Sequence, residues 1–215
     1  MKPIVPAIIP QSAEALRSTL EKLKFSPEIH VDVVDGKFVP FVSWPYEPAG
    51  NPLQVKASTD SYTLEVDLMV EDPLKAAREW IKAGADMLVF HVENISYEDF
   101  SNFMKTTSIS VSISALNETT LEIFKPYIKL ADAIQIMGIT KIGAQGQPLD
   151  ERVFDRITEL KRDFPRHPIT IDGSVNRETI KRLSRAGADR FICGSAIVGA
   201  GDPLLAYQKL RQEID

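Results

Sequence analysis

Four side chains capable of acid–base or metal chemistry lie on short apolar segments of strand length. They occur in the runs EIHVDVV, TLEVDLMV and PITID, and they are His30, Asp32, Asp67 and Asp172. In each run the reactive residues alternate with valine, leucine or isoleucine, and successive side chains of a strand point to opposite faces. We therefore expect the four polar groups on one face of a sheet, with the apolar residues on the other.

An imidazole and three carboxylates form a donor set for a divalent cation. Burying an unpaired carboxylate is costly, so such groups are paired or bind a metal. Mixed nitrogen and oxygen ligation suits Mn, Fe, Zn or Mg and does not choose among them. The alternative is an internal salt-bridge cluster, which we disfavour because this face carries no lysine or arginine. We therefore predict one divalent metal ion bound by His30, Asp32, Asp67 and Asp172.

The elements that must position these groups alternate regularly along the chain. Strand-like apolar runs lie at 4–9, 28–34, 63–70, 86–92, 108–114, 131–138, 168–172 and 190–195. Helical patterns lie at 13–24, 72–84, near 96–105, near 119–128, and at 149–164, 177–186 and 202–213, whereas 35–62 reads as a long loop with a short helix. Regular alternation predicts parallel strands with right-handed crossovers.

Eight such units in 215 residues predict a (β/α)8 TIM barrel of class α/β, formed by one domain over residues 1–215. An open doubly wound sheet is the rival, but the first strand–helix turn lacks G-x-G-x-x-G. The reactive face then points into the barrel. Alternation also places Glu65, Met69, Gln135 and Met137 inside. His91 and Glu93 are inward by the same rule, with catalytic and structural roles both open, while His167 precedes a strand and reads as a surface histidine.

Small residues follow the last three strands, in the runs IGAQGQ, DGSVN and CGSAI. Glycine lets a backbone approach a ligand closely, and the loops after strands seven and eight of such barrels commonly bind phosphate. Plain turns and helix caps use the same residue types and are the alternative. We take as candidate substrate- or phosphate-binding residues Gly146, Gly173, Ser174, Gly194 and Ser195.

Composition indicates which partners and which cell compartment to expect. The formal net charge is −5, which argues against a nucleic-acid-binding surface, since that requires a basic patch. The single cysteine, Cys193, permits no internal disulfide and fits a reducing compartment. Prolines break the short apolar N-terminal run, and no stretch has the ~18 apolar residues of a membrane span. We expect a cytoplasmic protein without a membrane or nucleic-acid partner.

These segments together resemble the ribulose-phosphate 3-epimerase family. IHVDVVDGKFVP (29–40) is similar to the family signature H-x-D-x-x-D-G-x-F-V-P, and EVDLMVEDP (65–73) to D-V-H-L-M-V-x-N-P. AGADMLVFHVE, ALNETT, TIDGSVN and AGADRFICGSAI match in order and spacing. The resemblance implies a (β/α)8 barrel that inverts C3 of ribulose 5-phosphate to give xylulose 5-phosphate, and a homo-oligomer.

The resemblance also implies roles. Asp32 and Asp172 would transfer protons on opposite faces of the substrate, and a metal would stabilise the anion formed next to the ketone. Met69 and Met137 would belong to the apolar cap of the site. We therefore expect a phosphorylated sugar as the substrate.

Several positions depart from the family pattern. The third-strand ligand is usually histidine and is Asp67 here, which favours a harder ion such as Mn or Mg or a site that has lost its metal. The serine at the end of strand one is Pro10, a cap methionine is Val34, and the second glycine of D-G-G is Ser174. The sixth loop is rewritten as IGAQGQ. A changed sugar phosphate is therefore one expectation, and a non-catalytic phosphosugar-binding relative without metal is the alternative. A decarboxylase of the wider phosphate-binding barrels ranks lower, because D-x-K-x-x-D is absent.

Overall fold

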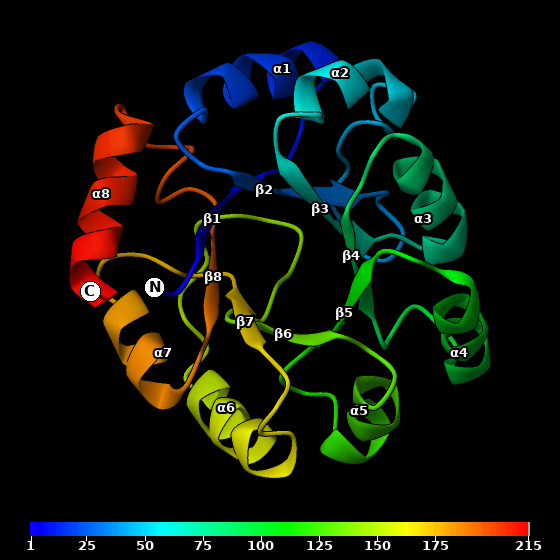
Figure 1. Ribbon diagram of the computed structural model, residues 1–215, viewed down its shortest axis with the longest axis vertical. Helices are drawn as coiled ribbons and strands as arrows, with labels where there is room; N and C mark the ends of the chain where they lie inside the picture. Colours follow the sequence, from blue (N-terminus) through cyan, green and yellow to red (C-terminus); the bar gives the residue numbers. More distant parts are fainter. Residues whose placement is uncertain (215) are drawn as a thin grey trace.

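The computed structural model describes residues 1–214 and contains eight parallel strands that close into a barrel in chain order (Figure 1). The strands are β1 (Ile4–Ile8), β2 (Glu28–Val34), β3 (Thr63–Met69), β4 (Met87–His91), β5 (Ser110–Ala115), β6 (Ala133–Met137), β7 (Ile169–Asp172) and β8 (Arg190–Cys193). β8 pairs with β1, so the sheet has no free edge. The prediction of a (β/α)8 barrel is confirmed.

Helices follow the strands and form an outer ring around the barrel (Figure 1). They are α1 (Ala13–Lys22), α2 (Lys56–Thr59), α3 (Pro73–Lys82), α4 (Tyr97–Thr106), α5 (Leu121–Ile128), α6 (Arg152–Asp163), α7 (Ile180–Ala186) and α8 (Pro203–Ile214), and a 3-10 turn, η1 (Pro52–Val55), precedes α2. Side chains of Ser12, Asp72 and Ser96 accept hydrogen bonds from backbone N–H groups that the first turn leaves unpaired. None of the helices within residues 1–214 has the length and apolar character needed to cross a membrane.

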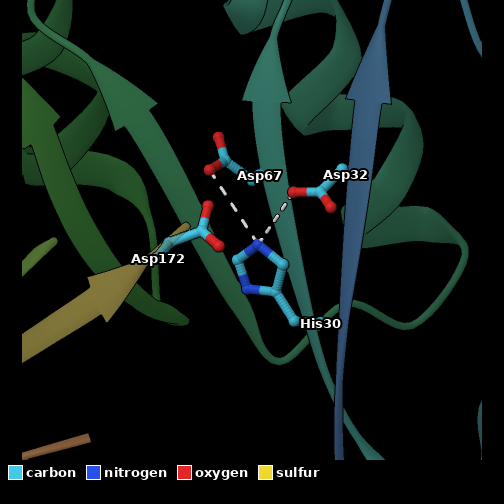
Figure 2. Close-up of side chains that lie close together, drawn as sticks. All are labelled: His30, Asp32, Asp67 and Asp172. Carbon is cyan, nitrogen blue, oxygen red and sulfur yellow. Dashed lines mark hydrogen bonds and ion pairs between the residues drawn. The ribbon is translucent and has the colours of Figure 1, made fainter. Parts of the chain in front are cut away.

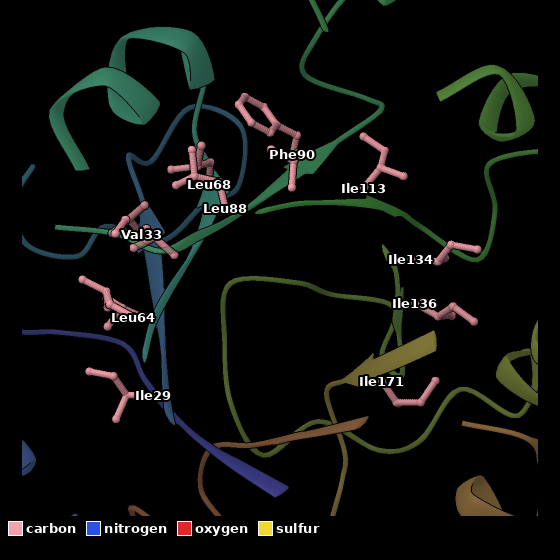
Figure 3. Close-up of a cluster of buried hydrophobic side chains, with 14 of the residues drawn as sticks. Ile29, Val33, Leu64, Leu68, Leu88, Phe90, Ile113, Ile134, Ile136 and Ile171 are labelled. Carbon is pink, nitrogen blue, oxygen red and sulfur yellow. The ribbon is translucent and has the colours of Figure 1, made fainter. Parts of the chain in front are cut away.

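The main hydrophobic core lies between the sheet and the helices. Figure 3 shows its side chains pointing from the strands toward the helical ring, among them Ile29, Leu64, Phe90 and Ile136. These are the apolar positions of the alternating runs, and their burial fixes the register of each strand because a one-residue shift would turn them inward. The polar positions of β2 and β3 consequently face the barrel interior, with Asp32 paired in register with Asp67.

The predicted segments agree with the structure in order and type, and the differences lie at element ends. The helix predicted at 177–186 begins only at Ile180. Its expected first turn is instead an Asx turn, in which Asn176 Oδ1 accepts hydrogen bonds from the N–H groups of Glu178 and Thr179. This turn matters for the site because it closes the short loop that begins at the end of β7.

Candidate active site

The four residues singled out by alternation converge inside the mouth of the barrel (Figure 2). His30 and Asp32 come from β2, Asp67 from β3 and Asp172 from the end of β7. One potential ligand atom of each lies within 4.8 Å of those of the others. His30 and Asp67 are fully buried, whereas Asp32 and Asp172 also line a cavity of about 160 Å³. The proposed proton-transfer pair is therefore the part of the cluster that a substrate can touch.

His30 faces carboxylates on both ring nitrogens. Its Nε2 lies 3.1 Å from Asp32 Oδ1, and its Nδ1 lies 2.6 Å from Glu65 Oε1. Burial alone would lower the pKa of His30, but the charges and hydrogen bonds of Asp32 and Glu65 outweigh it and raise the pKa well above its ordinary value. The ring is therefore held in one orientation, with Nε2 turned toward the cluster.

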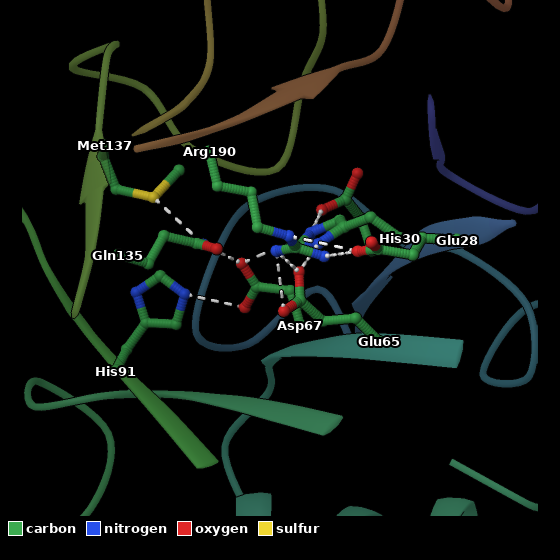
Figure 4. A network of polar contacts seen from close by, with 9 residues as sticks. Glu28, His30, Glu65, Asp67, His91, Gln135, Met137 and Arg190 are labelled. Carbon is green, nitrogen blue, oxygen red and sulfur yellow. Dashed lines mark hydrogen bonds and ion pairs between the residues drawn. The ribbon is translucent and has the colours of Figure 1, made fainter. Parts of the chain in front are cut away.

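Beneath His30, Glu65 forms an ion pair that the sequence analysis did not predict. The guanidinium of Arg190, the first residue of β8, donates to both oxygens of Glu65 at 2.8 and 3.0 Å, and to Glu28 at 3.0 Å (Figure 4). The expectation that the inward set has no lysine or arginine was therefore wrong. Arg190 lies on the inward face of β8 together with Ile192, two residues further along. The alternation of side chains along this strand could therefore have predicted that Arg190 points into the barrel.

The Arg190 pair neutralises Glu65 rather than the carboxylates at the mouth. Burial would raise the pKa of Glu65, but Arg190 and His30 lower it to about 2. Asp32, Asp67 and Asp172 receive no arginine or lysine hydrogen bond from the described residues. An internal salt-bridge cluster, the alternative raised by the sequence, is therefore present below the site, where Arg190 pairs with Glu65 and Glu28.

The two carboxyls that line the cavity, those of Asp32 and Asp172, have a raised pKa. Burial and the negative charge of Asp32 raise the pKa of Asp172 well above its ordinary value. Burial also raises the pKa of Asp32, although the positive charge of His30 opposes this. Neighbouring carboxyls in a poorly solvated site resist being ionised together, so one of them retains a proton to higher pH. A protonated and an ionised carboxyl facing one cavity form an acid–base pair.

Asp67 is held from two neighbouring strands. His91 Nε2 lies 2.8 Å from Oδ1, and Gln135 Nε2 donates to Oδ2 at 2.7 Å. His91 is fully buried and does not line the cavity, which favours the structural role that the sequence left open. The inward placement of Glu93 was wrong, because β4 ends at His91 and the alternation stops there. Glu93 is exposed and accepts hydrogen bonds from Leu116 N–H and the Thr119 hydroxyl.

His167 lies outside the site. It precedes β7, is half-buried, and its ring packs edge-on against Phe164 with 5.6 Å between ring centroids.

The glycines and serines of the last loops line one side of the cavity: Gly146, Gly173, Ser174, Gly194 and Ser195. Gly173 has φ +97°, and Ser174, at φ +54°, is the only non-glycine residue of the described chain in the left-handed region. The Ser174 carbonyl accepts hydrogen bonds from Thr179 Oγ1 at 2.6 Å and from Asn176 Nδ2 at 3.3 Å. The turn after β7 thus fixes an unfavourable serine conformation beside the cavity.

Close packing explains why two of these positions are glycine rather than a residue with a side chain. A Cβ on Gly173 would lie 2.8 Å from the Ile139 side chain, and one on Gly194 would lie 2.3 Å from the carboxamide of Gln145. Both partners belong to the loop between β6 and α6, which lies over the middle of the ring in Figure 1. The sequence did not identify Gln145, which contacts the backbone oxygen of Ala7 and lines the cavity.

Met69 and Met137 lie together in an apolar cluster at the mouth. The other buried members are Val34, Val39, Ile139 and Ile142. Two of these come from the rewritten loop after β6, so that loop contributes apolar surface the sequence analysis did not assign to it. Pro10 does not line the cavity, whereas Ala7 and Ile9 of the first strand and its following loop do. The β1 side of the mouth is therefore apolar.

Comparisons with known proteins agree with this geometry. The model of the ribulose-phosphate 3 epimerase family matches residues 3–198. The chain belongs to this family. It is 28% identical over 217 residues to a ribulose-phosphate 3-epimerase of Mycobacterium tuberculosis, covering 98% of this chain and 92% of the relative. It is 30% identical over 188 residues to that of Aquifex aeolicus, covering 85% and 82%.

Membership makes the protein an isomerase, an epimerase that acts on carbohydrates. Among solved structures, 3-keto-L-gulonate-6-phosphate decarboxylase from Vibrio cholerae aligns with a TM-score of 0.74 and 17% identity, covering 100% of this chain and 98% of that one. A likeness at that identity reflects the shared barrel. Within residues 1–214, no lysine or arginine lines the cavity, in keeping with the absent D-x-K-x-x-D pattern.

Proposed function

We propose that the protein epimerises C3 of a phosphorylated ketose, with the interconversion of ribulose 5-phosphate and xylulose 5-phosphate as the first reaction to test. The observation that carries this proposal is the pair Asp32 and Asp172. Both line the same cavity, one from β2 and the other from β7 (Figure 2). Inverting a carbon centre requires proton removal on one face and proton delivery on the other, and two separate carboxyls provide this.

The raised pKa values of Asp32 and Asp172 suit proton transfer to and from C3. The C3 proton of a ketose is acidic only because the adjacent ketone accepts the charge left behind. A carboxylate whose pKa is raised is a stronger base, and a carboxyl that retains its proton is an available acid. Asp172, whose pKa is raised well above its ordinary value, serves as the acid in the direction in which Asp32 serves as the base, and the roles reverse in the opposite direction.

The donor set fits a divalent cation held by His30, Asp32, Asp67 and Asp172. The ligand atoms lie close enough together, and His30 donates its Nδ1 hydrogen to Glu65, the arrangement that leaves Nε2 for a metal. Such a cation would polarise the ketone oxygen and stabilise negative charge on it. Binding requires Nε2 of His30 to give up its proton, so metal affinity should rise with pH.

We place the phosphate group of the substrate at the loops after β7 and β8. Gly173, Ser174, Gly194, Ser195 and Gly146 line that side of the cavity, and small residues allow backbone N–H groups to approach an anion. The methionines Met69 and Met137 cover the reacting carbons on the apolar side.

Isotope exchange provides the direct test of the proposed reaction. Purified protein is incubated in D2O with ribulose 5-phosphate, alone and with Mn2+, Zn2+ or Fe2+, and deuterium at C3 and the appearance of xylulose 5-phosphate are followed by NMR. We expect exchange and inversion in the metal-loaded protein. Absence of exchange on ribulose 5-phosphate and on several other ketose phosphates would refute the proposal.

A second candidate is a phosphosugar-binding protein that works without a metal. It is favoured by one observation: His30 and Asp67 already have hydrogen-bonding partners at both of their polar atoms. Elemental analysis of the purified protein distinguishes the two. Tight binding of a ketose phosphate, with no bound metal and no exchange after metal addition, would support this candidate.

The cytoplasmic location and the homo-oligomer remain predictions. A relative from Oryza sativa is described as a cytoplasmic isoform, which supports the first. Fractionation of cells that produce the protein, and light scattering after gel filtration, test them separately.

A further inference from the structure

The carboxylate of Asp67 is fixed at both oxygens by side chains from β4 and β6. Oδ1 contacts His91 Nε2 at 2.8 Å, and Oδ2 accepts from Gln135 Nε2 at 2.7 Å (Figure 4). All three residues are fully buried. The orientation of Asp67 is therefore set by neighbours that do not themselves reach the cavity.

His91 and Gln135 together form a clamp on the carboxylate of Asp67. This clamp leaves one oxygen of Asp67 able to bind a further partner in the cluster. Oδ1 is turned toward β4, whereas Oδ2 faces the cluster and lies 3.9 Å from Nε2 of His30. A carboxylate oxygen has two lone pairs, and Gln135 uses one of those on Oδ2. Oδ1 also keeps a second lone pair, but it is turned toward His91 and β4, so Asp67 presents Oδ2 alone to a cation in the cluster and acts as a one-oxygen ligand.

The arrangement of His91 and Gln135 around Asp67 leaves one polar atom of each without a hydrogen bond within residues 1–214. In the part of the chain that the structure describes, His91 Nδ1 and Gln135 Oε1 are buried and have no hydrogen-bond partner. A buried polar atom without a partner destabilises the folded protein, so two of them next to Asp67 need an explanation. An apolar side chain at either position would avoid the cost but could not orient Asp67.

We propose that His91 and Gln135 are positioning residues of the metal centre: they hold Asp67 as a one-oxygen ligand, and the resulting set of three carboxylates and one imidazole raises the ratio of Mn2+ to Zn2+ affinity above that of a site with a second imidazole in place of Asp67. Carboxylate oxygen suits hard ions such as Mn2+ and Mg2+, whereas each additional imidazole favours Zn2+. The inference rests on the proposed function for the presence of a metal, and it concerns which ion this chain selects.

Metal binding without substrate tests the inference separately from catalysis. The purified chain is stripped with a chelator and titrated with Mn2+ alone and Zn2+ alone by calorimetry, and bound Mn2+ is examined by electron paramagnetic resonance. The variants are Gln135→Met and His91→Leu, which remove a donor, and His91→Gln, which retains one. Asp67→His changes the ligand itself. Ser114→Ala is the matched control, because Ser114 is buried and in register with both His91 and Gln135 but makes no hydrogen bond to Asp67.

We expect Gln135→Met and His91→Leu to weaken Mn2+ binding by about 10- to 100-fold, the usual effect of removing a group that orients a ligand. His91→Gln should recover part of the loss, and Ser114→Ala should bind as wild type. Asp67→His should raise the ratio of Zn2+ to Mn2+ affinity by about tenfold or more. The inference is overturned if the wild type binds neither ion, if both donor-removing variants bind Mn2+ as wild type does, or if Asp67→His leaves the ratio unchanged. None of these outcomes depends on whether the protein epimerises a sugar.

Discussion

Nδ1 of His30 lies 2.6 Å from Oε1 of Glu65, and this contact links the mouth of the barrel to the ion pair at its base. Nη1 of Arg190 in turn donates to both oxygens of Glu65, so the imidazole contacts a carboxylate that is itself held in place. Side chains beneath a ligand orient it and set which ring nitrogen is available. The layer below the site therefore contributes to both stability and the geometry of His30.

We predict that Glu65→Gln destabilises the protein by about 3–5 kcal/mol, because it removes the buried negative charge that faces Arg190 and leaves that guanidinium paired with Glu28 alone among the described residues. Urea unfolding measures this loss. Glu118→Gln is the control: it breaks an exposed pair with Arg152 at 3.3 Å and should cost less than about 1 kcal/mol. Equal losses in the two variants would mean that Glu65 and Arg190 contribute no more than a surface pair.

The stability conferred by Glu65 should depend on pH in the acid range. Its pKa is lowered from 4.5 to about 2 in the folded protein, since Arg190 and His30 outweigh the effect of burial. A carboxyl with a depressed folded-state pKa stabilises the protein above its unfolded-state pKa, and the contribution is lost as the pH falls toward the folded-state value. The difference in unfolding free energy between wild type and Glu65→Gln should therefore be full above pH 4.5 and shrink between pH 4.5 and 2. A difference that stays constant over this window would contradict the assignment.

Asp172→Asn and Asp32→Asn should each lower isotope exchange at C3 by about 10²- to 10⁴-fold, because each removes one of the two groups that we propose to exchange a proton with the substrate. Thermal unfolding should show that both variants remain folded. Gln145→Ala serves as a comparison, since Gln145 lines the cavity but its carboxamide does not act as an acid or a base near neutral pH. Substantial exchange retained by Asp172→Asn would rule out the two-carboxyl mechanism.

The barrel and the convergence of its four polar residues could be predicted because both follow from alternation. The apolar partners of His30 and Asp32 must pack against the helices, and this leaves no freedom in where the polar groups point. The same rule failed where the strand ended: β4 stops at His91, and Glu93 turns outward to the following loop. Alternation is informative only while the backbone stays extended.

The remaining features depend on contacts between segments far apart in the sequence. Alternation places both Arg190 and Glu65 inside the barrel, but nothing in the sequence near either residue indicates that the two form an ion pair. The loop after β6 has no periodicity, so nothing in its sequence places Ile139 and Ile142 in the apolar cluster with Met69. Pro10 looked like a change inside the site, but it does not line the cavity and lies instead in a separate hollow with Phe41 and Val42.

The left-handed conformation of Ser174 leads to a prediction in which stability and binding change in opposite directions. A non-glycine residue in this region costs about 1–2 kcal/mol, so Ser174→Gly should stabilise the fold by up to about 1 kcal/mol after the greater freedom of glycine in the unfolded chain is counted. The same change removes a hydroxyl beside the cavity, which should weaken ribulose 5-phosphate binding by roughly 3- to 10-fold. Ser174→Ala retains the Cβ, and it should lose the same affinity without the gain in stability. Thermal unfolding and calorimetric titration of the three proteins separate the two effects. If Ser174→Gly binds the sugar phosphate as tightly as the wild type does, the serine hydroxyl has no part in recognition and the position tolerates serine at a cost to stability alone.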